Sequence, residues 1–286
     1  RKYENAYFQY RSGMIDDEFW DGHRQFCEQY VNPLLLRSVL GVPHNAWFRG
    51  SLEGIPAEEL SRLLPWRSRL SWNILTNVFM QARLQRTAGD GASLAKAQSR
   101  RLPKIGFEQM LRGLRNWIAK LEPAADGKTV WQDYAGDNSY STDEAKQKRE
   151  FIAEFTAATS PTSVIDIGCN TGDYSIVALE NGATRSIGFD FDHGALEFAY
   201  RRARDKNINL LPLHLDAANP SPDQGWLQAE RGGFSQRAKG DAVFGLALVH
   251  HLAIAKNIPL DQVVSWLLAM APAGVIEFLP KNDAMV

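Results

Sequence analysis

The sequence holds little that would mark a secreted, membrane-bound or nucleic-acid-binding protein. Its two cysteines, Cys27 and Cys169, lie in different parts of the chain, so we expect no disulfide framework and a cytoplasmic location. No apolar run reaches about eighteen residues and no signal peptide is recognised after Arg1, so we expect no membrane partner. The formal net charge of −1 provides no general attraction for nucleic acid.

Metal ligands are scarce as well. The six histidines and two cysteines show none of the spacings typical of a metal site, so we expect no bound metal.

The chain of 286 residues is long enough for two domains, and its 44% hydrophobic and 23% charged residues are ordinary for a globular protein. It begins at Arg1 rather than Met, from which we expect a missing N-terminal piece.

The first part of the chain has helical patterning and no strand alternation. Apolar residues recur at helical spacing in four segments, 16–40, 55–64, 70–86 and 107–121. Pro33 predicts a kink or a break in the first of these segments. The stretch 124–128 contains Gly and Asp and is the best candidate for a linker. We therefore predict an all-α domain over residues 1–124 that covers or shapes an acceptor pocket.

The second part, residues 125–286, alternates short apolar strands with helices. Ser141 and Glu144 form a capping box that predicts a helix reaching about Ala158. Pro212 predicts that the third strand is bent or lies near the sheet edge. The predicted fold class is α/β: a Rossmann-like, doubly wound parallel sheet with an N-terminal all-α domain. Five strands are expected, at 164–167, 186–191, 209–216, 241–248 and 274–279.

The strand at 164–167 runs into a glycine loop and then into a helix. Gly168 and Gly172 lack the Cβ that would keep a ligand away from the backbone N–H groups. Asp166, Asp190 and Asp216 each fall at the carboxyl end of a strand, where such sheets bind their ligands. Asp190 lies 18 residues beyond Gly172, and a carboxylate in that place accepts hydrogen bonds from a ribose diol. A nucleoside-containing ligand is therefore expected.

Two such ligands compete for the loop. A dinucleotide needs glycine where this chain has Asn170, and the acid at Asp166 would repel its pyrophosphate. S-adenosylmethionine carries no phosphate but has an ammonium and a sulfonium, which suit a carboxylate beside the loop, directly or through water. These differences favour the sulfonium ligand over NAD.

The same residues resemble the motifs of class I S-adenosylmethionine-dependent methyltransferases over about 131–286. The run 166–172 is similar to the first motif, with Asn170 in place of a common glycine, and Asp190 resembles the ribose-binding acid. In the helical half, the runs 19–26 and 54–56 look similar to the N-terminal regions of bacterial methyltransferases loosely labelled nodulation-type. The resemblance implies S-adenosylmethionine as cofactor and the following cofactor-binding residues: Asp166, Gly168, Cys169, Asn170, Gly172, Asp190, Phe191, Asp216, Ala217 and Tyr140.

The acceptor side is less well defined by the sequence. His250 and His251 follow the fourth strand, where His251 is a candidate general base, a wall of the pocket or a backbone partner. Glu277 ends the fifth strand and is a second catalytic candidate. Lys148 either contacts the site or is a solvated helix residue, and the second is expected. Two aromatic residues, Trp131 and Tyr134, are expected to belong to the core or to line the mouth of the site.

One departure from the family pattern affects the acceptor pocket. The family sheet has seven strands, but this chain ends at Val286, so we expect that the last strands are truncated or supplied differently. The sequence predicts methyl transfer to an O or N nucleophile of a small-molecule or glycan-type acceptor. The alternatives are an inactive methyltransferase-like interaction module and, third, an NAD-dependent oxidoreductase. The oligomeric state and the acceptor itself stay open.

Overall fold

The computed structural model describes residues 17–87, 104–124 and 142–278 of the chain. It divides into two compact units, Arg1–Asp126 and Gly127–Val286, which are taken one at a time below. None of the helices in the described ranges combines the length and the apolar character needed to span a bilayer.

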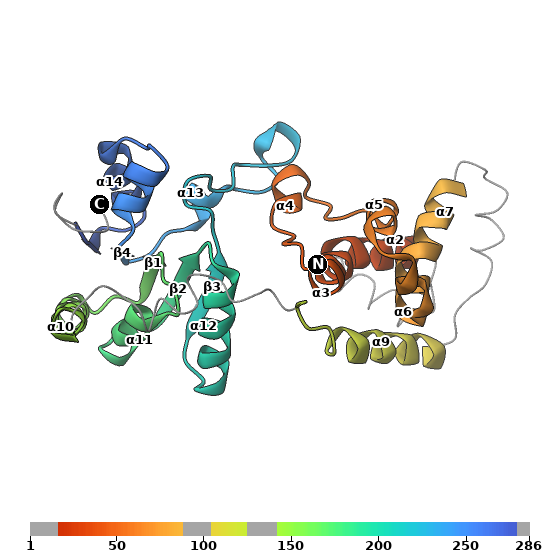
Figure 1. The fold of residues 1–286 in the computed structure, drawn as a ribbon, viewed down its shortest axis with the longest axis horizontal. Coiled ribbons are helices and arrows are strands. Elements are labelled where there is room, and N and C mark those ends of the chain that lie inside the picture. Colours follow the sequence, from red (N-terminus) through yellow and green to blue (C-terminus); the bar gives the residue numbers. More distant parts are fainter. Residues whose placement is uncertain (1–16, 88–103, 125–141, 279–286) are drawn as a thin grey trace. The chain divides into compact units, whose positions relative to one another are not determined.

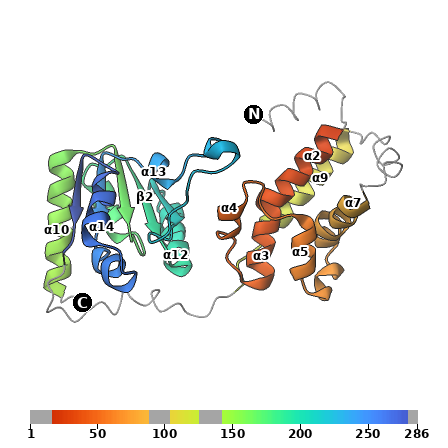
Figure 2. The same cartoon turned by 90° about the horizontal axis from the view of Figure 1, so that it is seen from above.

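The described part of the first unit is built from helices (Figures 1 and 2). The segment expected to be one long helix consists of α2 (Asp17–Phe26), a π-helical turn η1 (Cys27–Val31) and α3 (Asn32–Leu40). Pro33 does not break it, because it lies in the first turn of α3, and the neighbouring residues Val31 and Asn32 keep helical dihedral angles. α3 ends at Gly41, whose φ of 69° is the left-handed conformation that glycine adopts freely.

Most of the remaining helices in the described part of this unit fall in the predicted apolar segments, but α4 and η2 were not predicted. The remaining helices are α4 (Trp47–Gly50), α5 (Ala57–Leu63), η2 (Trp66–Leu70), α6 (Trp72–Ile74), η3 (Leu75–Met80), α7 (Gln81–Thr87) and α9 (Lys104–Ile118). Apolar side chains from η1, α3, α5 and η3 share one core, which removes their area from water and stabilises the unit. Its fully buried members include Val31, Leu35, Leu36, Ile55, Leu60 and Val78.

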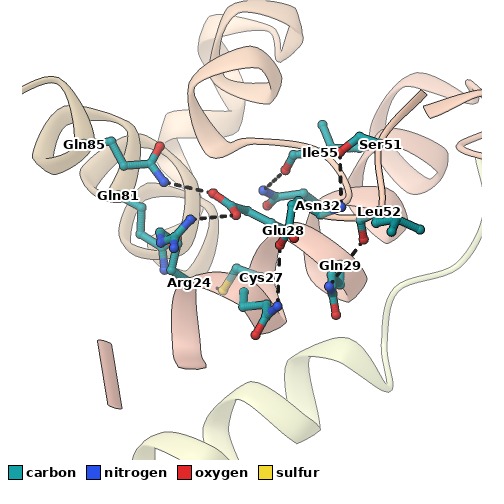
Figure 3. A network of polar contacts seen from close by, with 12 residues as sticks. Arg24, Cys27, Glu28, Gln29, Asn32, Ser51, Leu52, Ile55, Gln81 and Gln85 are labelled. Carbon is teal, nitrogen blue, oxygen red and sulfur yellow. Dashed lines mark hydrogen bonds and ion pairs between the residues drawn. The ribbon is translucent and has the colours of Figure 1, made fainter. Parts of the chain in front are cut away.

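A polar network ties this core together (Figure 3). The buried carboxylate of Glu28 accepts hydrogen bonds from Arg24 at 3.1 Å and from Gln85 on α7 at 2.9 Å. The backbone carbonyl of Glu28 accepts the N–H of Ile55 at 2.9 Å. Beside this bond, the Asn32 side-chain amide donates to the Ile55 carbonyl at 2.8 Å. Charged and polar groups in a core need such partners, and here they hold the 51–56 loop against η1.

The second unit contains a five-stranded parallel sheet in the order β3-β2-β1-β4-β5. The strands are β1 (Ser163–Ile167), β2 (Arg185–Asp190), β3 (Leu210–His214), β4 (Ala242–Gly245) and β5 (Ala273–Ile276). The position of β3 at the edge confirms the expectation from Pro212, which has no N–H to donate to a further strand. All five predicted strands are present.

Three strands were predicted to extend too far at their carboxyl ends. β3 ends at His214, so Asp216 lies two residues beyond the strand instead of closing it. β4 ends at Gly245 because the chain turns at Ala247, where φ is 50°, a value incompatible with a strand. β5 ends at Ile276, immediately before Glu277.

Helices cover both faces of this sheet (Figure 1). Along β1, Val164 packs into one core with Ile152 and Phe244, whereas Ile165 packs into another with Val243 and Leu267. This alternation from one residue to the next is what a strand buried on both faces requires. The first face is covered by α10 (Thr142–Thr159), α11 (Asp173–Glu180) and α12 (His193–Asp205), the second by α13 (Phe234–Arg237), η5 (His251–Ala255) and α14 (Leu260–Leu268).

Candidate cofactor site

The glycine loop connects β1 to α11 and is held against β2. The backbone N–H groups of Gly168 and Cys169 both donate to the Phe189 carbonyl, at 2.7 and 3.0 Å. Gly168 and Gly172 have φ values of 79° and 80°, and a Cβ at Gly172 would lie 2.7 Å from a methyl of Leu210. Both positions therefore favour glycine. The N-cap residue of α11, Gly172, has no side chain to cap the helix, and the backbone N–H of Ser175 in the first turn acts on the Asp166 carboxylate.

Asp190, the last residue of β2, is joined to this loop by its side chain. One carboxylate oxygen accepts the backbone N–H of Asn170 at 2.8 Å, and the other accepts that of Asp192 at 2.8 Å. Burial raises the pKa of Asp190, although these two N–H groups oppose the effect. Each carboxylate oxygen has capacity for two hydrogen bonds, so both can accept a further donor.

Asp192 caps the helix that follows. Its side-chain oxygen accepts the N–H groups of Gly194 and Ala195 at 2.7 and 2.9 Å, at the start of α12. This capping role explains why the acid lies buried.

Asp166 lies beneath the loop and is only 2% exposed. Its carboxylate accepts the hydroxyl of Ser175 at 2.7 Å, and Ser175 in turn accepts the hydroxyl of Ser186 at 2.9 Å. Removal from water raises its pKa to about 6, while the Ser175 hydrogen bond and the charge of Lys148 act in the opposite direction. Asp166 therefore joins β1 to α11, and its expected contact with a ligand stays a prediction.

An aromatic cluster lies where β2 and β3 end. The ring of Phe191 is 67% exposed and lies 5.5 Å from that of His214, which stacks on His193 at 4.5 Å. Burial lowers the pKa of His214, whereas the nearby charge of Asp216 raises it. Asp216 accepts the N–H of Ala218 with its side chain at 3.1 Å, which shapes the turn after β3. The predicted residues Asp190, Phe191 and Asp216 thus follow two adjacent strands.

The two catalytic candidates, His251 and Glu277, follow β4 and β5. A carboxylate oxygen of Glu277 accepts the N–H of Ala247 at 2.6 Å and pairs with the ammonium of Lys148 at 2.5 Å. His251 opens η5, with its ring 4.1 Å from that of His250. Burial, and then the neighbouring His250, lower the pKa of His251. The expectation that Lys148 is solvated was wrong, since its side chain is 13% exposed and paired.

The chain is similar in sequence to known proteins. No family model matches the chain. It is 48% identical over 273 residues to nodulation protein NoeA of Rhizobium meliloti (strain 1021), covering 95% of this chain and 57% of that protein. It is 24% identical over 153 residues to the ribosomal protein L11 methyltransferase of Pectobacterium atrosepticum, covering 46% of this chain and 52% of that enzyme. The parallel sheet with helices on both faces confirms the predicted α/β fold class of the second unit. The chain thus spans little more than half the length of the curated relatives it matches.

Two solved structures align with part of the chain. The crystal structure of WbdD is 17% identical, covering 60% of this chain and 37% of that chain with a TM-score of 0.41. The magnesium protoporphyrin IX methyltransferase ChlM of Synechocystis PCC 6803, solved with bound SAH, is 18% identical. It covers 60% of this chain and 68% of that chain with a TM-score of 0.37.

The second unit offers neither a reactive thiol nor a metal site in its described part. Burial and the charges of Asp166 and Asp190 raise the pKa of Cys169 well above its usual value, so its thiol stays protonated. Within the described residues, no three His, Cys, Asp or Glu side chains come together as metal ligands. Three predicted aromatic residues, Trp131, Tyr134 and Tyr140, lie outside the described residues.

Cys27 in the first unit has neighbours that resemble a nucleophile and its base. Its sulfur lies 3.7 Å from Nε2 of His23, and the same nitrogen lies 3.1 Å from the Asn77 side chain. However, the cysteine is fully buried, and burial raises the pKa of its thiol to about 12. A protonated, inaccessible thiol is inert, so this arrangement is structural.

Sequence reasoning missed Ser175 and assigned Lys148 to the solvent. Ser175 follows the glycine loop by less than one helical turn, and a small hydroxyl residue in an apolar run is a weak signal for a buried partner. Lys148 shares a helix face with Ile152 and Phe155, both of which pack into a core cluster. A lysine within an apolar stripe was the available signal, because that face points toward the sheet.

Proposed function

We propose that this chain is an S-adenosylmethionine-dependent methyltransferase acting on an O or N nucleophile of a small-molecule or glycan-type acceptor. The observation that carries the proposal is the Asp190 carboxylate, held at the end of β2 by the N–H groups of Asn170 and Asp192. Held in this way beside the glycine loop, both of its oxygens can still accept hydroxyl donors, as recognition of a ribose diol requires.

Asp190 and the residues around it bind different portions of the cofactor. Asp190 accepts the two ribose hydroxyls, while the exposed ring of Phe191 and the turn at Asp216 and Ala217 receive the adenine. The loop from Gly168 to Gly172 faces the amino-acid portion with its backbone. The side-chain oxygen of Asn170 has no hydrogen-bond partner among the described residues and is suited to accept an N–H donor.

The chemistry needs little from the protein. When bound, S-adenosylmethionine supplies an activated methyl group, whose bond to sulfur breaks as a bond to oxygen or nitrogen forms, leaving S-adenosylhomocysteine. The protein contributes mainly by holding both partners in line. His251 is the candidate base, because a lowered pKa leaves its imidazole neutral and able to accept a proton at pH 7. Glu277 is less suited to proton transfer, since Lys148 and the Ala247 N–H share one of its oxygens.

The competing dinucleotide interpretation has less support. A pyrophosphate over the loop would lie above the buried Asp166. The carboxylate would repel it, because the positive charge of Lys148 offsets the charge of Asp166 only in part. A second candidate function, a binding module without turnover, is disfavoured because the Asp190 arrangement is intact. We further propose a cytoplasmic enzyme without nucleic-acid or membrane partners, in which the helical first unit serves acceptor binding and Tyr140 is a cofactor-binding residue.

Isothermal titration calorimetry tests the proposal. The chain is titrated with S-adenosylmethionine, S-adenosylhomocysteine and NAD, and the series is repeated with Asp190→Ala. Asp205→Ala serves as the matched control, because Asp205 is an exposed carboxylate that pairs with adjacent Arg204. We expect both sulfur nucleosides to bind, NAD to show no heat, and only Asp190→Ala to lose affinity.

Two other outcomes would contradict the proposal. Binding of NAD without binding of either sulfur nucleoside would favour the oxidoreductase. Binding of S-adenosylmethionine without turnover across a panel of hydroxyl and amine acceptors would favour the binding module.

A further inference from the structure

A single carboxylate oxygen joins three elements of the second unit. Glu277 directly follows β5, and its backbone N–H donates to the Gly245 carbonyl at the end of β4 at 3.1 Å. Its side-chain oxygen accepts the Ala247 N–H at 2.6 Å and pairs with Lys148 of α10 at 2.5 Å. Lys148 and Glu277 are separated by 129 residues in the sequence. The loop after β4 is therefore tied to α10 and to β5 through one side chain.

The loop that Glu277 holds has an unfavourable backbone conformation. Ala247 has a φ of 50°, which costs free energy in any residue that carries a Cβ. Such a conformation persists only where its surroundings enforce it, and the hydrogen bond from the Ala247 N–H to Glu277 is such a restraint. The loop then leads into the helical segment that carries His250 and His251.

Lys148 lies in surroundings that strengthen its pairing. Its side chain and that of Glu277 are 13% and 18% exposed, so water screens the ion pair less than it would on the surface. The ammonium also lies 4.8 Å from the centre of the Tyr174 ring, a favourable cation–π distance. Its charge acts on Asp166 as well, so it balances two carboxylates at the ends of β1 and β5.

The sheet order separates the Lys148–Glu277 pair from the residues proposed to bind the nucleoside. β2 and β3, with Asp190 and Asp216, lie on one side of β1, while β4 and β5 lie on the other. A nucleoside held over β2 and β3 leaves the ends of β4 and β5 for the amino-acid portion of the cofactor and for the acceptor.

We infer that Lys148 and Glu277 are positioning residues that hold the Ala247 turn, and with it the His250–His251 segment, beside the amino-acid portion of the cofactor. The inference rests on the proposed function. It assigns the pair a role in binding the amino-acid portion of the cofactor. A pair that only stabilises the fold would affect binding of the nucleoside and of the amino-acid portion alike.

Two probes separate the halves of the site. S-adenosylhomocysteine contains the nucleoside and the amino-acid portion, whereas 5′-methylthioadenosine retains only the nucleoside side. The variants are Glu277→Gln, which keeps an acceptor for Ala247 but removes the charge, Lys148→Met, and Lys148→Arg, which restores the charge. Lys146→Met is the control, because Lys146 lies on the same helix in an exposed pair with Glu150 at 3.8 Å.

We expect Glu277→Gln and Lys148→Met to lose roughly tenfold in affinity for S-adenosylhomocysteine, as loss of a charged hydrogen bond typically costs. Their affinity for 5′-methylthioadenosine should stay within about twofold. Lys148→Arg should recover most of the loss, and Lys146→Met should bind both probes like the unmodified chain. Thermal melting of each variant identifies any that fails to fold.

A double-mutant cycle tests the restraint on Ala247 directly. Glycine adopts a positive φ without strain, so Ala247→Gly should reduce the effect of Glu277→Ala on S-adenosylhomocysteine affinity by about threefold or more. Equal losses for both probes, or additive effects in the cycle, would overturn the inference while leaving the proposed function intact. Failure of the unmodified chain to bind either probe would overturn both.

Discussion

The carboxylate of Asp190 accepts the backbone N–H of Asn170, 20 residues earlier in the chain, at 2.8 Å. This bond connects the end of β2 to the middle of the glycine loop, where Asn170 has a φ of 49°. The other oxygen of Asp190 accepts the N–H of Asp192 at 2.8 Å, which leads into the cap of α12. The residue proposed to bind the ribose therefore also organises the loop and the helix around it.

The first prediction concerns the stability that Asp190 supplies. Asp190→Ala removes the acceptor of two backbone N–H groups, each of which costs about 1–3 kcal/mol when it is left without a partner. We expect the free energy of unfolding to fall by roughly 2–4 kcal/mol, and by less in Asp190→Asn, which keeps one carbonyl oxygen. Urea denaturation measures both changes. An unchanged midpoint for Asp190→Ala would mean that these N–H groups find other acceptors.

The second prediction concerns the pH dependence caused by Asp166. Its pKa in the folded chain is raised to about 6 from the ordinary carboxyl value of 3.8, mainly by burial. The folded state therefore holds this proton more tightly than the unfolded state. The resulting stability is fully present below about pH 4 and is lost as the pH rises through 6, amounting to about 3 kcal/mol at most.

Asp166→Asn isolates this contribution. The substitution removes the charge but keeps a partner for Ser175, so we expect the variant to gain stability relative to the unmodified chain as the pH rises from about 4 to about 7. The measurement is the difference between their unfolding free energies across that range, which cancels the other titrating groups. If the difference does not change with pH, Asp166 is not the buried acid responsible. Cofactor affinity should fall in the same variant, because the negative charge beneath the loop is lost.

The third prediction concerns the two thiols. Burial raises the pKa of Cys27 to about 12 and that of Cys169 well above its usual value. Both should react with Ellman's reagent at about pH 8 only when the chain unfolds, since the thiolate is the reactive form. The comparison is the reaction rate in buffer and in guanidinium chloride. Rapid reaction of one thiol in buffer would show that the corresponding cysteine is accessible and ionised.

The fourth prediction compares two glycines of the first unit. A Cβ at Gly54 would lie 2.2 Å from the backbone oxygen of Glu28, and its φ of 88° is unfavourable for other residues. Gly54→Ala should therefore destabilise the unit by about 3 kcal/mol or more, through overpacking and backbone strain together. A Cβ at Gly22, within α2, would meet no atom of the described residues within 4 Å. Gly22→Ala should stabilise by about 0.5–1 kcal/mol, the helix propensity difference.

Thermal denaturation of both glycine variants checks the pair. A similar effect of the two substitutions would contradict the close approach of the 51–56 loop to η1, on which the network in Figure 3 depends.

The five strands, and Asp190 at the end of β2, were predictable because their signals are local. Apolar runs bounded by glycine and aspartate located all five strands, and Pro212 correctly indicated the edge. The ends of β4 and β5 were not predictable. Nothing in the run Gly245-Leu246-Ala247 indicates that alanine adopts a positive φ, because the hydrogen bond that holds it comes from Glu277.

The sequence by itself determined the strand–loop–helix at 163–180, the positions of Asp166 and Asp190 relative to it, and the helical character of the first part. These follow from periodicity and from the conformational needs of glycine, which act within a few residues. Only the tertiary structure decided the partners of each charge: Asn170 for Asp190, Ser175 for Asp166 and Glu277 for Lys148. The physical reason is that burial and pairing depend on which elements pack together, and the free energy of a charge depends on those neighbours more than on its place in the chain.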